Sequence, residues 1–155
     1  DQNIKNIKGL KFQKAGIYQI PFQDNAFDYV FLHDVLHHID EKEQSSQKHI
    51  SGLLELKRVC KVGGKVIILE GNRFNPLFYP HMVLMKGHNH FRQGYFKKIL
   101  RDVFGENIGF RAFEAHFYPP KLLKLFKIFE FISEKVPFLK PFRAYNLAII
   151  KMISD

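Results

Sequence analysis

Histidines that follow apolar segments are the residues of this 155-residue chain best suited to proton transfer. They are His33, His37, His38, His88 and His90. Imidazole suits this chemistry near neutral pH because its unperturbed pKa is about 6.5. We take His38 and His33 as the first candidates for a general base, with His88 and His90 behind them. One of His37 and His38 is expected to cap or pack a helix instead.

Two apolar runs of strand length end next to these candidates. They are Phe27 to His33 and Lys65 to Glu70, both rich in aromatic or β-branched residues. Such runs are typical of strands covered on both faces, as in a parallel sheet. Ligands bind outside the carboxyl ends of parallel strands. That rule nominates Gly16-Ile17, His33-Asp34 and the stretch Glu70-Gly71-Asn72-Arg73.

Strand-like and helix-like segments alternate along the rest of the chain. We expect further strands at 11–15, 110–118 and 144–152, and helices from Ser45 or Ser46 to the Gly63-Gly64 turn, over 92–104 and over 120–135. Alternation of this kind predicts an α/β fold with a mostly parallel sheet.

The helix expected over 120–135 has an unusually wide apolar face. Burial between the sheet and the irregular stretch 71–91 is the interpretation we favour, because a helix on one sheet face normally needs only a narrower stripe. A homodimer contact or a lysine-flanked helix at a membrane surface are the alternatives.

Composition limits the possible partners and compartments. The formal net charge is +9, but the lysines are spread along the chain, so nucleic acid is not expected as the main partner. The single cysteine, Cys60, excludes an intramolecular disulfide and a cysteine-based zinc site. No apolar run reaches the roughly 20 residues that cross a bilayer. We therefore expect a soluble cytoplasmic protein.

Three motifs carry a resemblance to a known family. Ile20 to Val30 (IPFQDNAFDYV) resembles the LPF-x-D-N-x-FD-x-V signature of class I S-adenosylmethionine-dependent methyltransferases. Leu36 to Ile39 (LHHI) resembles the LHH or LEH element that follows it. Arg58 to Lys65 (RVCKVGGK) is similar to the R-V-L-K-P-G-G turn, with Cys and Val in place of Leu and Pro. Their order and spacing agree with the family over about residues 16–71.

The resemblance implies a Rossmann-like sheet, mostly parallel with an antiparallel last strand, and S-adenosylmethionine as the cofactor. In this family a glycine-rich loop after the first strand embraces the cofactor, and the sequence contains no such loop. We infer that the N-terminal strands of the sheet are missing from this sequence. Without them the strand at 27–33 presents an unpaired apolar edge, which self-association could cover.

The resemblance also suggests which residues contact the cofactor. Asp1 stands about where an acidic residue binds the ribose hydroxyls. Gly16 and Ile17 occupy the adenine position, where a backbone N–H and an apolar side chain would meet the ring. His33 and Asp34 correspond to positions beside the methionine part.

The irregular stretch 71–91 is expected to be a lid or insert over the acceptor pocket, because it is too long for an ordinary connection. Its candidate substrate-binding residues are Asn72, Arg73, Asn75, Tyr79, His88 and His90, with Phe74, Phe78 and Met82 as an apolar wall. No carboxylate or cysteine stands beside its histidines, so we predict no metal site there.

These observations favour methyl transfer from S-adenosylmethionine to a small-molecule or lipid-like acceptor. A general base is needed only for a poorly nucleophilic acceptor. Two alternatives remain open, namely a non-catalytic binding or scaffold domain with the same fold, and a basic module associated with membranes or RNA.

Overall fold

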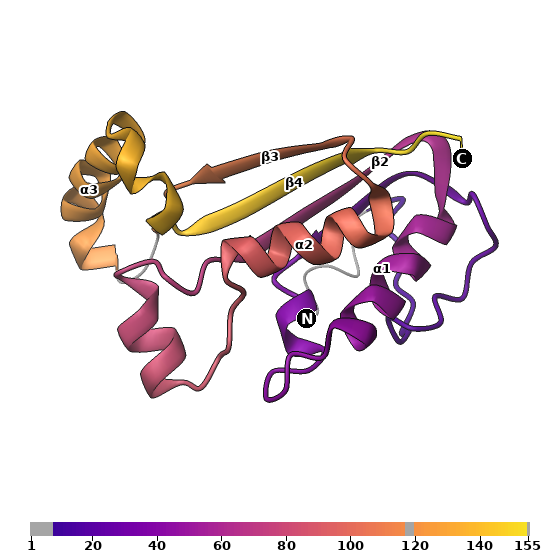
Figure 1. Ribbon diagram of the computed structural model, residues 1–155, viewed down its shortest axis with the longest axis horizontal. Coiled ribbons are helices and arrows are strands. Elements are labelled where there is room, and N and C mark those ends of the chain that lie inside the picture. Colours follow the sequence, from indigo (N-terminus) through magenta and orange to yellow (C-terminus); the bar gives the residue numbers. More distant parts are fainter. Residues whose placement is uncertain (1–7, 117–119, 155) are drawn as a thin grey trace.

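Four strands form one mixed sheet in which only the last strand is reversed (Figure 1). The computed structural model describes residues 8–116 and 120–154. The strands are β1 (Phe27–His33), β2 (Cys60–Gly71), β3 (Ile108–Phe113) and β4 (Tyr145–Lys151). Their order is β1-β2-β4-β3. β1 is parallel to β2, and β4 is antiparallel to both β2 and β3. This arrangement confirms the predicted α/β sheet with an antiparallel last strand.

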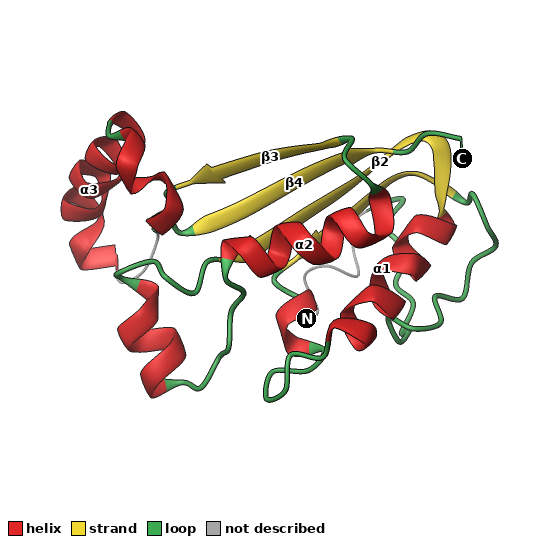
Figure 2. Cartoon of the chain, viewed as in Figure 1, coloured by secondary structure: helices red, strands yellow, loops and turns green. Residues whose placement is uncertain are grey.

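Helices cover one face of this sheet and extend beyond one end of it. α1 (Ser46–Val59) and α2 (Gln93–Phe104) lie side by side in front of the strands, and α3 (Leu123–Lys135) lies beyond the carboxyl end of β3 (Figure 2). Short helical turns occupy Leu36–His38, Tyr79–Met85, Pro120–Leu122 and Pro137–Phe142.

The main core lies between the sheet and the α1–α2 pair. Both helices place apolar residues at spacings of three and four, which puts them on one face. In α2 this face consists of Phe96, Ile99 and Leu100, all fully buried. They pack with alternate residues of the strands, since side chains along a strand point to opposite faces. The strand residues of the core include Val66, Ile68, Ala148 and Ile150.

The opposite face and the β1 edge are open among the described residues. Tyr29 and Phe31 of β1 are 67% and 63% exposed. The prediction that β1 is covered on both faces is therefore wrong for the described part of the chain, because the described helices α1 and α2 pack on one face of the sheet only. The edge of β1 is open as well, since its only strand neighbour among the described residues is β2. The predicted apolar strand edge is present.

Two local predictions differ from the structure. Residues 11–15 form no strand, and Gly16 instead pairs with Gln19 across a tight turn. Gly63 and Gly64 do not end the helix, which stops at Val59, but lie inside β2. A Cβ on Gly64 would lie 2.7 Å from the carbonyl oxygen of Asp28, so the close approach of β1 requires glycine there.

The Arg58 guanidinium ties α1 to the turn that precedes β1. It donates to both carboxylate oxygens of Glu55, to Asp24 Oδ1 at 2.8 Å and to the Ile20 and Phe22 carbonyls. Glu55 Oε2 in turn accepts from the Ile20 N–H at 2.9 Å. A planar guanidinium with five donors can satisfy all of these acceptors at once. Two of the sequence motifs are therefore joined by a single side chain.

Glu55→Gln tests this connection through its pH dependence. Hydrogen bonds from Arg58 and from the Ile20 N–H lower the pKa of Glu55 from 4.5 to about 2. A depressed carboxyl pKa stabilises the fold above the unfolded-state pKa, and this contribution is lost as the pH falls from about 4.5 towards 2. We expect Glu55→Gln to cost about 1 kcal/mol at pH 7, with the deficit shrinking by pH 3. Urea unfolding at both pH values measures this, and an equal deficit at the two would contradict the assignment.

Candidate active site

The carboxylate of Glu70 joins the carboxyl ends of β1 and β2. Its Oε1 accepts from the backbone N–H groups of Val35 at 3.0 Å and Leu36 at 2.7 Å, and its Oε2 lies 2.7 Å from His37 Nδ1. Both Glu70 and His37 are almost completely buried. A carboxylate is costly to bury unless hydrogen bonds replace its hydration, and three do so here. The turn after β1 is thereby held against β2.

Asp34 makes a second connection between the same two strand ends. Its backbone adopts φ of +50°, which turns the side chain back so that Oδ1 accepts from the Gly71 N–H at 2.9 Å. Its Oδ2 lies 3.1 Å from His33 Nε2. A Cβ on Gly71 would lie 2.6 Å from His90 Nδ1, so the glycine permits the imidazole of His90 to rest on the strand end.

A cavity of about 550 Å³ opens beside Asp34 and Gly71. The strand ends, the 71–91 segment and the region around α3 each contribute to its wall, which is mainly apolar. The lining residues are Asp34, Gly71, Leu77, Phe78, His81, Met82, His90, His116, Leu122, Phe126 and Tyr145. An apolar cavity with a few converging polar groups is the usual form of a small-molecule site.

His90 is the most unusual polar group in this wall. It is 4% exposed, and neither ring nitrogen has a hydrogen-bond partner within the described part of the chain. Burial, together with the neighbouring His37, lowers the pKa of His90 to about 4. The imidazole is therefore neutral at pH 7 and can accept one hydrogen bond and donate another. Burial and the nearby Asp34 raise the pKa of Tyr145, so its hydroxyl keeps its proton.

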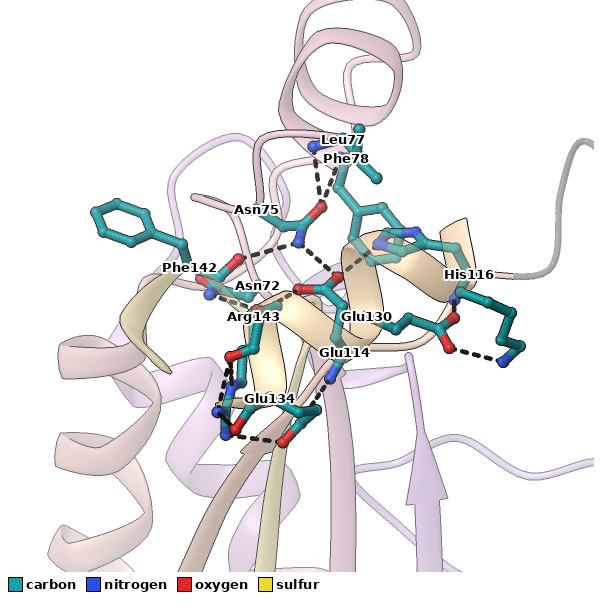
Figure 3. Close-up of polar contacts among 12 residues, drawn as sticks. Asn72, Asn75, Leu77, Phe78, Glu114, His116, Glu130, Glu134, Phe142 and Arg143 are labelled. Carbon is teal, nitrogen blue, oxygen red and sulfur yellow. Dashed lines mark hydrogen bonds and ion pairs between the residues drawn. The ribbon is translucent and has the colours of Figure 1, made fainter. Parts of the chain in front are cut away.

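Asn75 serves the fold behind the cavity. Its Nδ2 donates to Glu114 Oε1 and the Phe142 carbonyl, and its Oδ1 accepts from the N–H groups of Leu77 and Phe78 (Figure 3). All hydrogen-bonding positions of the buried amide are occupied. The prediction that Asn75 binds the acceptor is corrected, because no free donor remains.

Asn72 is used in the same manner. It is fully buried, and its Nδ2 donates at 2.8 Å to the carbonyl of Arg143 (Figure 3). Nδ2 also donates at 2.8 Å to the carbonyl of Pro141, and Oδ1 accepts from the Phe74 N–H. Asn72 therefore connects the end of β2 to the start of β4, and we do not retain it as an acceptor-binding residue.

The remaining predicted residues are dispersed. Gly16 lines a separate surface hollow near Arg58, and Ile17 packs towards Gly52 of α1. Arg73 lines another hollow with Glu41. His33 is half-exposed and lies beside the Tyr145 ring, and Tyr79 starts a helical turn. His38 and His88 both contact Glu41. Asp1 lies outside the described residues. Only Asp34 and His90 of the predicted site residues line the cavity.

Relatives that match this sequence are named as methyltransferases. Residues 1–68 match a family described as a methyltransferase domain. An uncharacterised methyltransferase of Schizosaccharomyces pombe is 38% identical over 76 residues, which are 49% of this chain and 25% of that protein. A ubiquinone/menaquinone biosynthesis C-methyltransferase of Geotalea daltonii is 33% identical over 111 residues, which are 72% of this chain and 39% of that protein. The chain thus spans well under half the length of these curated relatives.

Solved structures share the fold at low sequence identity. An S-adenosylmethionine-dependent methyltransferase of Thermotoga maritima superposes with a TM-score of 0.63 at 15% identity, over 97% of this chain and 67% of that one. The N-methyltransferase NodS of Bradyrhizobium japonicum, solved with S-adenosyl-L-homocysteine, gives 0.59 at 10% identity, over 99% and 59%. Residues 1–68 of this chain therefore resemble a methyltransferase domain, and nearly the whole chain shares the fold of class I methyltransferases.

Several residues of the candidate site carry no local sequence signal. His116, Leu122, Phe126 and Tyr145 reach the cavity from the last third of the chain. Nothing in their spacing relates them to Asp34, because they are brought there by the return of the chain through β3, α3 and β4. Glu70, which does not line the cavity but holds the turn after β1, did carry a local signal, because it is a carboxylate at the end of an apolar strand run.

Gly71→Ala tests the contact between the strand end and His90. The new methyl group would displace the His90 imidazole, so we expect a loss of about 1–3 kcal/mol in the free energy of unfolding. Gly94→Ala is the matched control, since no described atom lies within 4 Å of a Cβ there and the residue is helical. That control should be neutral or stabilising by up to about 1 kcal/mol. Equal stabilities of the two variants in urea would contradict the close packing at Gly71.

Proposed function

We propose that this chain forms the acceptor-binding part of an enzyme that transfers a methyl group from S-adenosylmethionine to an apolar small-molecule or lipid-like acceptor. The observation that carries the proposal is the apolar cavity at the carboxyl ends of β1 and β2, with Asp34 and Gly71 on its rim. The relatives in ubiquinone and menaquinone biosynthesis and the neighbour solved with S-adenosyl-L-homocysteine support the same chemistry.

The residues at the strand ends fit the methionine part of this cofactor. The bound cofactor would supply an electrophilic methyl group on a positively charged sulfonium. Asp34 offers a carboxylate whose orientation is set by the Gly71 N–H, and Gly71 leaves the strand end without a side chain. A negative group held in advance beside a positive centre stabilises it without reorganisation. We assign Asp34 and its ion-pair partner His33 to this end, and leave Gly16 and Ile17 unassigned.

The cavity wall would align the acceptor and exclude water from it. Methyl transfer is an in-line displacement, so most of the catalytic effect comes from holding the nucleophile in line in a preorganised site. Phe78, Met82 and Phe126 provide an apolar surface for a ring or chain. The neutral His90, with no partner of its own among the described residues, would accept the hydrogen bond of an acceptor hydroxyl. His90 replaces His38 as our candidate base, because His38 does not line the cavity.

Kinetics of the natural full-length protein test this proposal. With labelled S-adenosylmethionine and a panel of phenols and quinol precursors, we expect His90→Gln to lower kcat at least about tenfold, in the range of general-base loss. Cofactor affinity should stay unchanged in this variant, whereas Asp34→Asn should weaken it. Lys86→Gln, on the exposed end of the same segment, is the control. Methyl transfer with full kcat in His90→Gln would remove His90 from the mechanism.

An exposed apolar face on α3 suggests where a lipid-like acceptor comes from. We call Leu125, Ile128, Phe131, Ile132 and Phe138 the α3 face, and each is about half exposed or more. The prediction that this helix is buried between the sheet and the 71–91 segment is wrong, because α3 lies beyond the sheet and only Phe126 and Ser133 of it are buried.

We propose that the α3 face rests on an anionic phospholipid membrane. Exposed lysines lie close to these residues in the sequence, including Lys124, Lys135 and Lys140. Apolar residues flanked by lysines suit the boundary between headgroups and acyl chains. Leu122 and Phe126 of the same region line the cavity, which gives an apolar acceptor a short path from the bilayer. No helix of the described residues is long and apolar enough to cross a membrane, so the contact would be peripheral.

Sedimentation with vesicles tests the membrane contact. We expect the full-length protein to bind vesicles of phosphatidylcholine with phosphatidylglycerol, and salt to weaken this binding. Ile128→Glu with Phe131→Glu should abolish it. Leu54→Glu changes an equally exposed apolar residue on α1 and should have no effect. If the double variant bound vesicles normally but converted a dimer to a monomer in ultracentrifugation, a second copy would be the occupant instead.

A further inference from the structure

Four potential metal ligands converge at the turn after β1, outside the lining of the cavity. They are His37, His38, Glu41 and His88, whose ligand atoms all lie within 4.8 Å of one another. Glu41 Oε1 is the centre of the group, at 2.6 Å from His38 Nδ1 and 3.2 Å from His88 Nδ1. We call these four residues the histidine cluster.

The cluster is built from two distant parts of the chain that other contacts hold together. His88 lies 47 positions after Glu41. The neighbouring Asn89 donates to the Glu41 carbonyl at 2.8 Å, and Gln44 donates to the Asn89 carbonyl at 2.6 Å. These backbone-directed bonds fix the 88–89 segment against the turn independently of the ligand side chains. The proximity of the four side chains is therefore part of the architecture.

Glu70 gives His37 the orientation of a metal ligand. Its carboxylate engages His37 Nδ1 at 2.7 Å, which leaves Nε2 as the atom that a metal would use. A histidine ligand commonly donates its other ring N–H to a buried carboxylate in just this manner, because the contact fixes the tautomer and strengthens the donor. Glu70 is completely buried, and His37 is the only side chain paired with its carboxylate among the described residues.

We propose that the histidine cluster binds one divalent transition-metal ion of the zinc type. Three imidazole nitrogens and one carboxylate oxygen are donors that Zn²⁺ takes in four-coordinate sites, whereas Ca²⁺ and Mg²⁺ require mostly oxygen ligands. In a tetrahedral site with metal–ligand bonds of about 2.0–2.2 Å, the ligand atoms lie about 3.4 Å from one another. Small rotations of the partly exposed side chains would therefore lengthen the contacts of Glu41 with His38 and His88 and bring the more distant ligand atoms closer. The Glu41 carboxylate balances part of the ion's charge.

An ion can reach the cluster from solvent. His38, Glu41 and His88 each keep about a third to a half of their side-chain surface exposed. Glu41 also lines a surface hollow with Gly87 and Asn89. His37 is also close to Asp34 and His90, but these two face the cavity and belong to the candidate active site.

A bound ion would fasten the 71–91 segment to the sheet. It would link the turn after β1 to His88, two residues before the cavity residue His90. Its predicted effect is on the order and stability of the cavity wall, with no part in the transfer of the methyl group. An experiment can therefore rule out metal binding without affecting the proposed function, and the loss of the proposed function would leave the metal site untouched.

Metal titration of the natural full-length protein, first stripped with a chelator, tests the proposal. By calorimetry we expect one Zn²⁺ per chain with a dissociation constant of about 1 μM or lower, and no comparable binding of Mg²⁺. Co²⁺ should give the visible absorption of a four-coordinate site. Saturating Zn²⁺ should raise the unfolding temperature, because a ligand that binds the folded state stabilises it.

Single substitutions distinguish this site from scattered surface histidines. His88→Ala and Glu41→Gln should each weaken Zn²⁺ binding by about tenfold or more, since even second-shell contacts are worth that much. His81→Ala removes an exposed histidine from the same segment and should bind as the wild type does. Circular dichroism checks that each variant is folded, and Glu41→Gln, at a partly exposed position, is the variant least able to disturb the core. Unchanged one-site binding in both cluster variants, or only weak binding at several sites, would overturn the proposal.

Discussion

The structure depends on one buried carboxylate. Glu70 sits at the end of the longest strand and accepts hydrogen bonds from two consecutive backbone N–H groups and one imidazole, all from the turn after β1. Those bonds place Leu36 in the core and His37 beside it. The cavity residue Asp34 and the cluster residue His37 flank in sequence the two backbone N–H groups that Glu70 holds, so the cavity and the histidine cluster both depend on this connection. Removing the whole carboxylate would leave these three groups without their partner.

The sequence predicted the elements whose apolar spacing is set by local contacts. β1 was predicted at Phe27 to His33 and is found there, and the helix predicted over 92–104 differs by one residue from α2. Errors arose where a long-range contact decides the structure. Gly63 and Gly64 signal a turn locally, but the close approach of β1 makes them part of β2. α3 has the apolar width of a buried helix, yet its position beyond β3 leaves that width exposed.

The candidate site was predictable where a residue directly follows a strand or lies in the stretch expected to be a lid. Asp34 follows β1, so the rule for parallel strands locates it, and His90 was reached through the expected lid. Asn72 and Asn75 have suitable chemistry for binding an acceptor, but carbonyls and a carboxylate from elsewhere in the chain occupy their amides. Likewise His88 has no acidic neighbour in sequence and gains Glu41 only through the fold. Pairings of this type have no periodicity to detect.

The contacts that hold α3 to the ends of the strands determine how this helix can open. Its links to the strands are directional, with Arg143 donating to the carbonyls of Ser133 and Glu134, and with Glu134 accepting from the Glu114 N–H. Apolar packing tolerates gradual sliding, but hydrogen bonds of this kind are either formed or broken. α3 should therefore open as a cooperative unit, exchanging its amide hydrogens together and well before those of β2 and β4.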